Sequence, residues 1–317
     1  MNGIELSRRY YRTEVAPGLA GVRHAAALLG DGSEVLGFDD EVSTDHDFGP
    51  RVQIFIPDRH TVAGFFRDRL GFDPGAGVRV ADWLLTPTQI LAGLTRGAVF
   101  HDPDGELARY RAALAWYPDD VWRYALAAGW LKVAQEEAFI GRTGSTGDHL
   151  GSQLVTARLA RELVRLAFLV ERRWAPYGKW LGRACTELTL SAEVGPLLSG
   201  ALGAAHWRQR EQLIGTAGGI VAAATNTLGL APAVDPAPRQ FYDRDIRVLG
   251  ADRFTVALCR EITDPVLRAV IDRVGRRAGV VGRLPGTIDQ AADSTDVLTS
   301  PARFRAAAPM LGLATTD

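Results

Sequence analysis

The spacing of apolar positions divides the chain into an alternating first part and a helical second part. In the first hundred residues, short apolar runs such as "HAAALLG" and "VQIFIP" alternate with longer stretches of helical period. Short runs bounded by glycine or proline are typical of buried strands. The pattern therefore predicts an α/β arrangement around a small sheet, with helices over 4–15, 58–70 and 86–94 and strands over 24–30, 47–57, 77–83 and 97–102.

After residue 104 the apolar positions recur with the period of a helix. Long stripes cover 117–141 and 149–174, and shorter helical segments follow as far as residue 230. Long helices joined by short loops are typical of a bundle. We therefore expect an α+β protein in which a small mixed β-sheet domain (1–103) precedes an all-α helical-bundle domain (104–317). The polar end of the chain is expected to wrap the surface.

The amino-acid composition excludes few classes of function. The chain has 317 residues, a formal net charge of -1 and 47% hydrophobic residues. This balance supports a core but gives no general attraction to nucleic acid or anionic membrane, so neither is expected as a partner. Cys185 and Cys259 show no CxxC spacing and are expected to be buried free thiols. The polar N-terminus and the lack of a long apolar run predict a cytoplasmic protein.

Two aspartates, Asp45 and Asp47, stand one residue apart at the entrance to a predicted strand. Residues i and i+2 of a strand share a face, so their charges repel unless a cation compensates them. Mg²⁺ prefers such oxygen ligands. Upstream, Gly32 permits a close backbone approach to a phosphate and Ser33 offers a hydroxyl. The alternative is a solvated loop, because "DDEVSTDHD" is acidic throughout.

These residues resemble the nucleotidyltransferase superfamily related to DNA polymerase beta. In that superfamily a glycine-serine pair ends the first strand, an acidic pair opens the next, and a third acidic residue follows on a neighbouring strand. Gly32 and Ser33 match the first pair, and Asp45 and Asp47 match the second. Asp82, in the predicted strand 77–83, is our choice for the third. The alternative is that Asp82 caps the turn into the helix that follows.

More narrowly, "GSEVLGFDDEVSTDHD", "VFHD", "YPDDVW" and "RRWAPYGKW" resemble a bacterial family of unknown function within this superfamily, which has a C-terminal helical domain. The resemblance implies Mg²⁺-dependent transfer of a nucleoside monophosphate, with ATP as the expected donor, to a small-molecule or protein acceptor. Asp45 and Asp47 would hold the metal, Asp82 would join them in catalysis, and Gly32 and Ser33 would bind phosphate. A non-catalytic nucleotide-binding or regulatory module is the alternative. The acceptor and the oligomeric state stay open.

Three residues of the helical part are further candidates for nucleotide binding. Lys179 follows a proline as in the P-x-x-K turn of antibiotic-modifying nucleotidyltransferases, and that resemblance implies contact with the triphosphate. Arg158 and Arg165 share one helix face with Glu162 at i, i+4 and i+7 spacing. That face either lines the cleft or forms a row of surface salt bridges.

Overall fold

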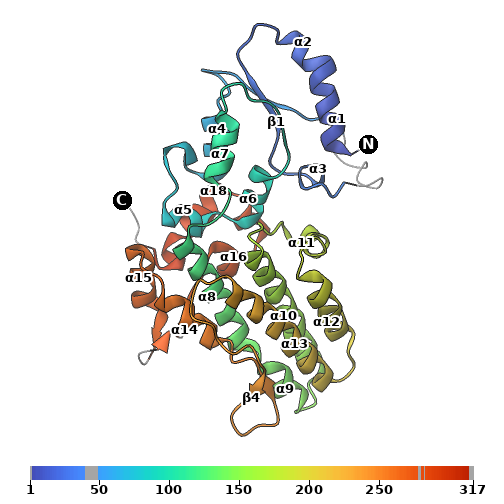
Figure 1. The fold of residues 1–317 in the computed structure, drawn as a ribbon, viewed down its shortest axis with the longest axis vertical. Coiled ribbons are helices and arrows are strands. Elements are labelled where there is room, and N and C mark those ends of the chain that lie inside the picture. Colours follow the sequence, from blue (N-terminus) through green and yellow to red (C-terminus); the bar gives the residue numbers. More distant parts are fainter. Residues whose placement is uncertain (1, 40–48, 278–279, 282, 314–317) are drawn as a thin grey trace. The chain divides into compact units, whose positions relative to one another are not determined.

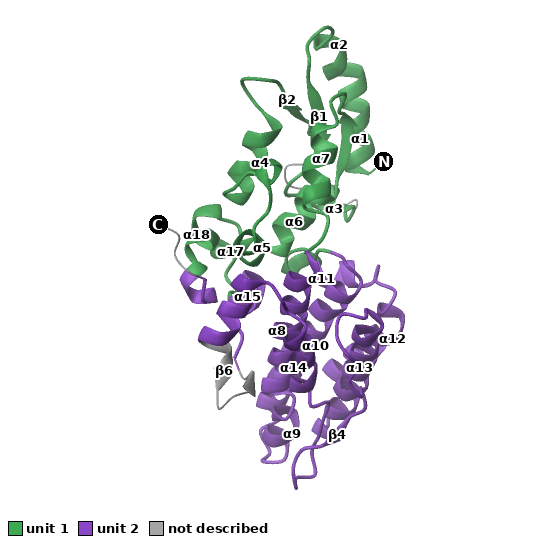
Figure 2. Ribbon diagram, turned by 60° about the vertical axis from the view of Figure 1, so that its left-hand side comes forward, with its two compact units in different colours: residues 1–117, 174–180, 292–308 green, residues 118–173, 181–291, 309–317 purple. Residues whose placement is uncertain are grey.

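The computed structural model describes residues 2–39, 49–277, 280–281 and 283–313. It is a mixed α/β structure, mostly helical, with small sheets of two or three strands (Figure 1). The expected combination of a small sheet with many helices is confirmed. The chain forms two compact units (Figure 2), which are unit 1 (1–117, 174–180 and 292–308) and unit 2 (118–173, 181–291 and 309–317). The contacts thus divide the chain after Tyr117, whereas the sequence placed a boundary at 103.

The sheet of unit 1 has the order β2-β1-β3, with β1 (Ala25–Leu28) in the centre. Both β2 (Gln53–Phe55) and β3 (Ala98–His101) run antiparallel to it, so the described sheet is antiparallel rather than mixed as predicted. Alanines and a leucine suit the central strand, whose last three residues are fully buried. Because of the antiparallel register, the end of β1 lies beside the starts of β2 and β3.

Short helices surround this sheet. Helix α4 (Val62–Leu70) begins at Thr61, whose hydroxyl accepts the N–H of Gly64, and ends at Gly71 in the left-handed conformation. These signals confirm its predicted end. The other helical elements of unit 1 are α1 (Gly3–Tyr10), η1 (Tyr11–Val15), α2 (Ala16–Gly18), α3 (Ser33–Leu36), η3 (Pro74–Ala76), α5 (Val80–Leu85), α6 (Thr88–Thr95), α7 (Glu106–Ala113), α17 (Thr295–Leu298) and α18 (Pro301–Ala306).

The predicted strand over 77–83 is wrong, because Val80–Leu85 forms helix α5. Asp82 occupies the third helical position and accepts the backbone N–H of Arg79 at 3.0 Å, so its carboxylate caps the first turn of the helix. Three successive apolar residues, Trp83 to Leu85, are all buried. A half-buried strand would expose every second one. The alternation of Val78 and Val80 was too short to decide between the two structures.

Unit 2 is built on two long helices, α8 (Asp119–Glu136) and α10 (His149–Val170), which pack on each other. The predicted stripes over 117–141 and 149–174 are thereby confirmed. The other helical elements are α9 (Phe139–Gly144), α11 (Gly178–Cys185, which starts in unit 1), α12 (Ser191–Gly203), α13 (Trp207–Thr227), α14 (Asp252–Arg260), α15 (Pro265–Val270), η4 (Ile271–Gly275), α16 (Ile288–Ala291) and η5 (Ala308–Leu311, which starts in unit 1).

The second part of the chain is not entirely helical. It contains two small antiparallel hairpins, one formed by β4 (Arg239–Gln240) and β5 (Arg247–Val248) and the other by β6 (Arg276–Arg277) and β7 (Val280–Val281). Two-residue strands carry no periodicity that a sequence pattern can show. The predicted free cysteines are confirmed, because both thiols are buried and unpaired. Within the described ranges, no helix is both long and apolar enough to cross a membrane.

Two late segments of the chain complete unit 1. Residues 174–180 bring the ring of Trp174 to 4.4 Å from that of Trp116, and its indole N–H donates to the carbonyl of Leu114 at 3.1 Å. Residues 292–308 contribute α17 and α18, with Leu298 and Phe304 buried. The polar end of the chain therefore does more than cover a surface, because it supplies part of the core of unit 1.

Candidate functional site

The turn that follows β1 (residues 29–32) lies closely against helix α6. Gly30 (φ 96°) donates its N–H to the carbonyl of Gly93 in α6 at 2.9 Å, and a Cβ at Gly93 would collide with the carbonyl oxygen of Gly30. Gly32 adopts φ 131° and ψ 147°, a conformation that other residues rarely adopt. Ser33 then begins α3. The glycine-serine pair thus follows the turn after the central strand and leads into α3, whereas the superfamily pattern has the pair at the end of the strand itself.

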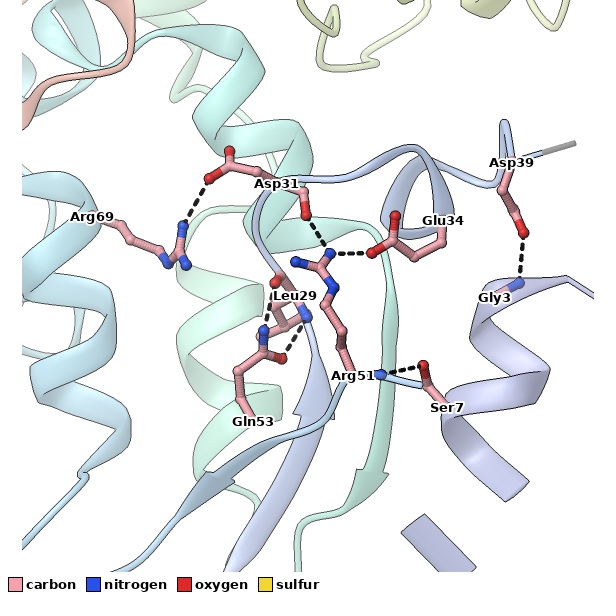
Figure 3. Close-up of polar contacts among 9 residues, drawn as sticks. All are labelled: Gly3, Ser7, Leu29, Asp31, Glu34, Asp39, Arg51, Gln53 and Arg69. Atoms are coloured by element: carbon pink, nitrogen blue, oxygen red, sulfur yellow. Dashed lines mark hydrogen bonds and ion pairs between the residues drawn. The ribbon is translucent and has the colours of Figure 1, made fainter. Parts of the chain in front are cut away.

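The entrance to β2 is held beside this turn by side-chain hydrogen bonds (Figure 3). Gln53 accepts the N–H of Leu29 at 2.9 Å and donates to its carbonyl at 3.0 Å, which extends the pairing of β1 with β2 beyond the backbone ladder. The N–H of Arg51 donates to the hydroxyl of Ser7 in α1 at 3.1 Å. The polypeptide that enters β2 is therefore anchored at the end of the sheet where the turn lies.

Two arginines face the turn from different elements (Figure 3). Arg51, just before β2, donates from Nη2 to the carbonyl of Asp31 at 2.6 Å and pairs with the carboxylate of Glu34. Arg69, in α4, pairs through Nη1 with the carboxylate of Asp31 at 3.2 Å. Arg51 Nε is buried and has no hydrogen-bond partner among the described residues. The turn thus has two cationic groups within reach, which the sequence analysis did not identify.

The segment 174–180 belongs to the same unit and brings aromatic side chains to Phe38, just after α3. The ring of Trp180 lies 5.5 Å from that of Phe38, and its indole N–H donates to the hydroxyl of Tyr177 at 2.7 Å. Burial raises the pKa of Tyr177, and the negative charges of Asp31 and Glu34 raise it further.

Lys179 is exposed at the start of α11, in unit 1, with Nζ 4.9 Å from the ring centroid of Trp180. A lysine that stacks on an aromatic ring keeps its charge available to solvent. The predicted nucleotide-binding residues Gly32, Ser33 and Lys179 thus belong to one compact unit, although the elements from β2 to α10 separate Lys179 from the other two in sequence.

The predicted metal ligands Asp45 and Asp47 lie outside the described residues. The residues on either side of them are anchored to α1, because Asp39 accepts the N–H of Gly3 at 2.6 Å and Arg51 bonds to Ser7. Elsewhere, within the ranges that the structure describes, no group of three or more His, Cys, Asp or Glu side chains is placed to hold a metal ion.

Asp82 occupies a different environment from the one predicted. Its side chain is 1% exposed, and its carboxylate accepts hydrogen bonds from Arg79 Nε at 3.0 Å and from Arg305 Nη2 at 2.5 Å. Burial alone would raise the pKa of Asp82, but the hydrogen bonds from the two guanidinium groups outweigh it and hold the pKa below its usual range. This geometry gives the Asp82 carboxylate a structural role at the start of its own helix, α5, and not at the turn into the next helix, where the capping alternative put it.

Arg158 and Arg165 lie in unit 2, where each is engaged with a neighbouring helix. Arg158 pairs with Glu136 of α8 while remaining mostly exposed, and Arg165 donates to the carbonyl of Asp289 in α16 at 2.7 Å. Glu162 pairs with Lys132 of α8 at 3.1 Å. These three residues therefore connect α10 to α8 and α16. Two of the three contacts are salt bridges, as the salt-bridge alternative predicted.

A cavity of about 440 Å³ lies at the opposite end of the same sheet, where β1 begins and β2 and β3 end. Two of the acidic residues that line it, Asp102 and Asp104, already serve the fold. Asp102 accepts the N–H groups of Leu107 and Ala108 at the start of α7, and Asp104 pairs with Arg23 at 3.0 Å. Its volume alone would favour this cavity as a ligand-binding site. The residues suited to bind phosphate, however, lie around the turn at the other end of the sheet, and we place the candidate site there.

Comparison with protein families finds one match. Residues 83–181 match a family described as a domain of unknown function (DUF4037). The matched region runs from α5 through α8 and α10 to the start of α11, so it contains Lys179 but not the glycine-serine turn or the acidic pair. Neither the curated proteins nor the solved structures contain a match to this chain.

Proposed function

We propose that this protein is a Mg²⁺-dependent nucleotidyltransferase, in which the sheet β2-β1-β3 belongs to a nucleotidyltransferase-type domain and unit 2 is its helical domain. The observation that carries the proposal is the return of residues 174–180 to unit 1, where Trp180 lies against Phe38, just after α3. The exposed Lys179 thus belongs to the same unit as Gly32 and Ser33. A glycine turn, a hydroxyl and nearby cations are the groups that hold a polyphosphate.

In the proposed reaction the acceptor attacks the α-phosphorus of a nucleoside triphosphate, expected to be ATP. The bond from that phosphorus to the oxygen bridging it to the β-phosphate breaks, and pyrophosphate leaves. The Gly32 backbone and the Ser33 hydroxyl would position the phosphates, and Lys179 would offset their charge. The carboxylates of Asp45 and Asp47 offer the hard oxygen donors that Mg²⁺ prefers, and the bound ion would neutralise the charge that develops on the phosphate oxygens.

The experiment that tests this function compares triphosphates labelled at the α or the γ position. Nucleotidyl transfer carries the α label to the acceptor or to the protein itself and releases pyrophosphate, whereas phosphoryl transfer carries the γ label. We expect α-label transfer that requires Mg²⁺. Tight nucleotide binding without release of pyrophosphate would instead support the non-catalytic nucleotide-binding or regulatory module.

Lys179→Ala should weaken triphosphate binding by roughly 1–2 kcal/mol, about 5- to 30-fold, because a charge-assisted contact with phosphate is lost. The loss should shrink at high salt, where screening reduces the contribution of an exposed charge. Titration calorimetry at low and high salt measures both effects. Arg183→Ala, one turn further along α11, is the matched control and should bind like the wild type. If Lys179→Ala and the wild type bind the triphosphate with equal affinity, Lys179 is an ordinary surface residue with no role in nucleotide binding.

A further inference from the structure

The space directly beside the Gly32 backbone is already occupied by an ion pair. A Cβ built on Gly32 would lie 2.6 Å from both Glu34 Oε1 and Arg51 Nη2, so these two groups fill the place where a side chain would be. The Glu34 carboxylate pairs with the same Arg51 nitrogen that donates to the carbonyl of Asp31. An anion that approaches Gly32 from this side therefore competes with the carboxylate of Glu34 for Arg51.

Arg69 lies against the same turn from the side of α4. A Cβ on Gly30 would meet the Arg69 guanidinium at 3.0 Å, and this guanidinium also stacks 4.7 Å from the ring centroid of Phe65. Its partner Asp31 has a side chain that is 84% exposed, so solvent screens that pair. Two arginines and two carboxylates thus balance each other around the turn, and each arginine is held by contacts that do not depend on its carboxylate.

We propose that Arg51 and Arg69 bind the phosphate groups of the ligand, and that Glu34 occupies the phosphate position on Arg51 until the ligand displaces it. This proposal rests on the proposed function for the identity of the ligand as a triphosphate. A phosphate group carries more charge than a carboxylate and matches the planar guanidinium with two oxygens, so it competes well for the same nitrogens. Glu34 then acts as an internal competitor that lowers the affinity for weakly charged anions.

Tripolyphosphate in EDTA is the probe, because it contains the phosphates without the base and its binding does not depend on a metal ion. Titration calorimetry compares the wild type with Glu34→Gln, Arg51→Gln, Arg69→Gln and the control Arg67→Gln. Arg67 is matched to Arg69, since it lies two residues earlier in α4 and pairs with an acidic residue, Asp73, at 3.4 Å. Circular dichroism tests whether each variant is folded.

Glu34→Gln should bind tripolyphosphate about 5- to 10-fold more tightly than the wild type, because the competing anion is gone. Arg51→Gln should bind about 10-fold or more weakly, Arg69→Gln should also bind more weakly, and Arg67→Gln should match the wild type. Tighter binding by Glu34→Gln supports the proposal even if Arg51→Gln does not fold. If Glu34→Gln binds tripolyphosphate no better than the wild type, or if neither protein binds it, the proposal is overturned.

The transfer assay separates this inference from the proposed function. If the variants change tripolyphosphate binding as expected but no triphosphate yields pyrophosphate, the anion site stands and the transferase proposal fails. If pyrophosphate is released and tripolyphosphate binding is the same in the wild type and in Glu34→Gln, the transferase proposal stands and the roles of Arg51 and Glu34 fail.

Discussion

Asp82→Asn should lower the free energy of unfolding by about 3 kcal/mol at neutral pH. The reason is the burial of this carboxylate, which is 1% exposed and accepts hydrogen bonds from Arg79 and Arg305. Removing its charge leaves the partly buried Arg305 without its counterion. The effect should be large because Arg305 lies in the segment 292–308, which this ion pair ties to α5 across 223 residues of sequence.

The stabilisation should depend on pH in a defined direction. The pKa of Asp82 is held below its usual range in the folded protein. The stability that the carboxylate contributes is therefore complete above the pKa of an unfolded aspartate, about 3.9. It disappears as the pH falls through the lower pKa of the folded state. The difference between the wild type and Asp82→Asn should accordingly be full at neutral pH and small at the most acidic pH at which the protein folds.

Urea unfolding followed by circular dichroism at several pH values measures this difference. Asp296→Asn is the matched control, because its carboxylate pairs with Arg303 at 3.8 Å but is 86% exposed, and its stability should stay at the wild-type value. A double-mutant cycle with Arg305→Gln isolates the coupling of the pair. An Asp82→Asn protein of unchanged stability that loses its transferase activity would return Asp82 to the catalytic assignment.

The case of α5 shows which parts of the fold a sequence pattern can predict. The spacing of apolar residues correctly predicted β1, β3 and the long helices α8 and α10. Each of these elements buries one face or its whole length, and it does so over enough residues for the spacing to be recognised. In 77–83 only two valines alternated, and the helix cap that Asp82 forms with the N–H of Arg79 outweighed that short signal. The helix was readable in principle from the run of Trp83 to Leu85, which no half-buried strand would contain.

The composition of unit 1 could not be predicted by the same means. Residues 174–180 and 292–308 join it through contacts such as that of Trp174 with Trp116 and that of Arg305 with Asp82. Such contacts join residues far apart in sequence, and a local pattern records only which residues are apolar. In the candidate site, Gly32, Ser33 and Lys179 carried recognisable motifs. Arg51 and Arg69 carried none, because an arginine acquires its role at this turn only through the pairing of β1 with β2 and the position of α4.

Replacing either member of the acidic pair, Asp45 or Asp47, should have a large effect on catalysis. Each side chain replaced singly by asparagine should lower Mg²⁺-dependent transfer by about 10³-fold or more, because a metal site that loses a carboxylate no longer offsets the charge of the reacting phosphates, a contribution of several kcal/mol. Asparagine keeps the shape and removes the charge, so folding should be unaffected. The anchors on either side, Asp39 on Gly3 and Arg51 on Ser7, remain in place in both variants.

The decisive measurement is nucleotide affinity with and without Mg²⁺, because it reports the metal site without requiring turnover or a known acceptor. In the wild type Mg²⁺ should strengthen triphosphate binding, and in Asp45→Asn and Asp47→Asn this strengthening should disappear while binding in EDTA stays the same. Asp68→Asn, an exposed carboxylate in α4, is the control and should keep the wild-type response. If Mg²⁺ strengthens binding equally in all four proteins, the metal is held elsewhere, and the acidic stretch before β2 is the solvated loop that its composition also allows.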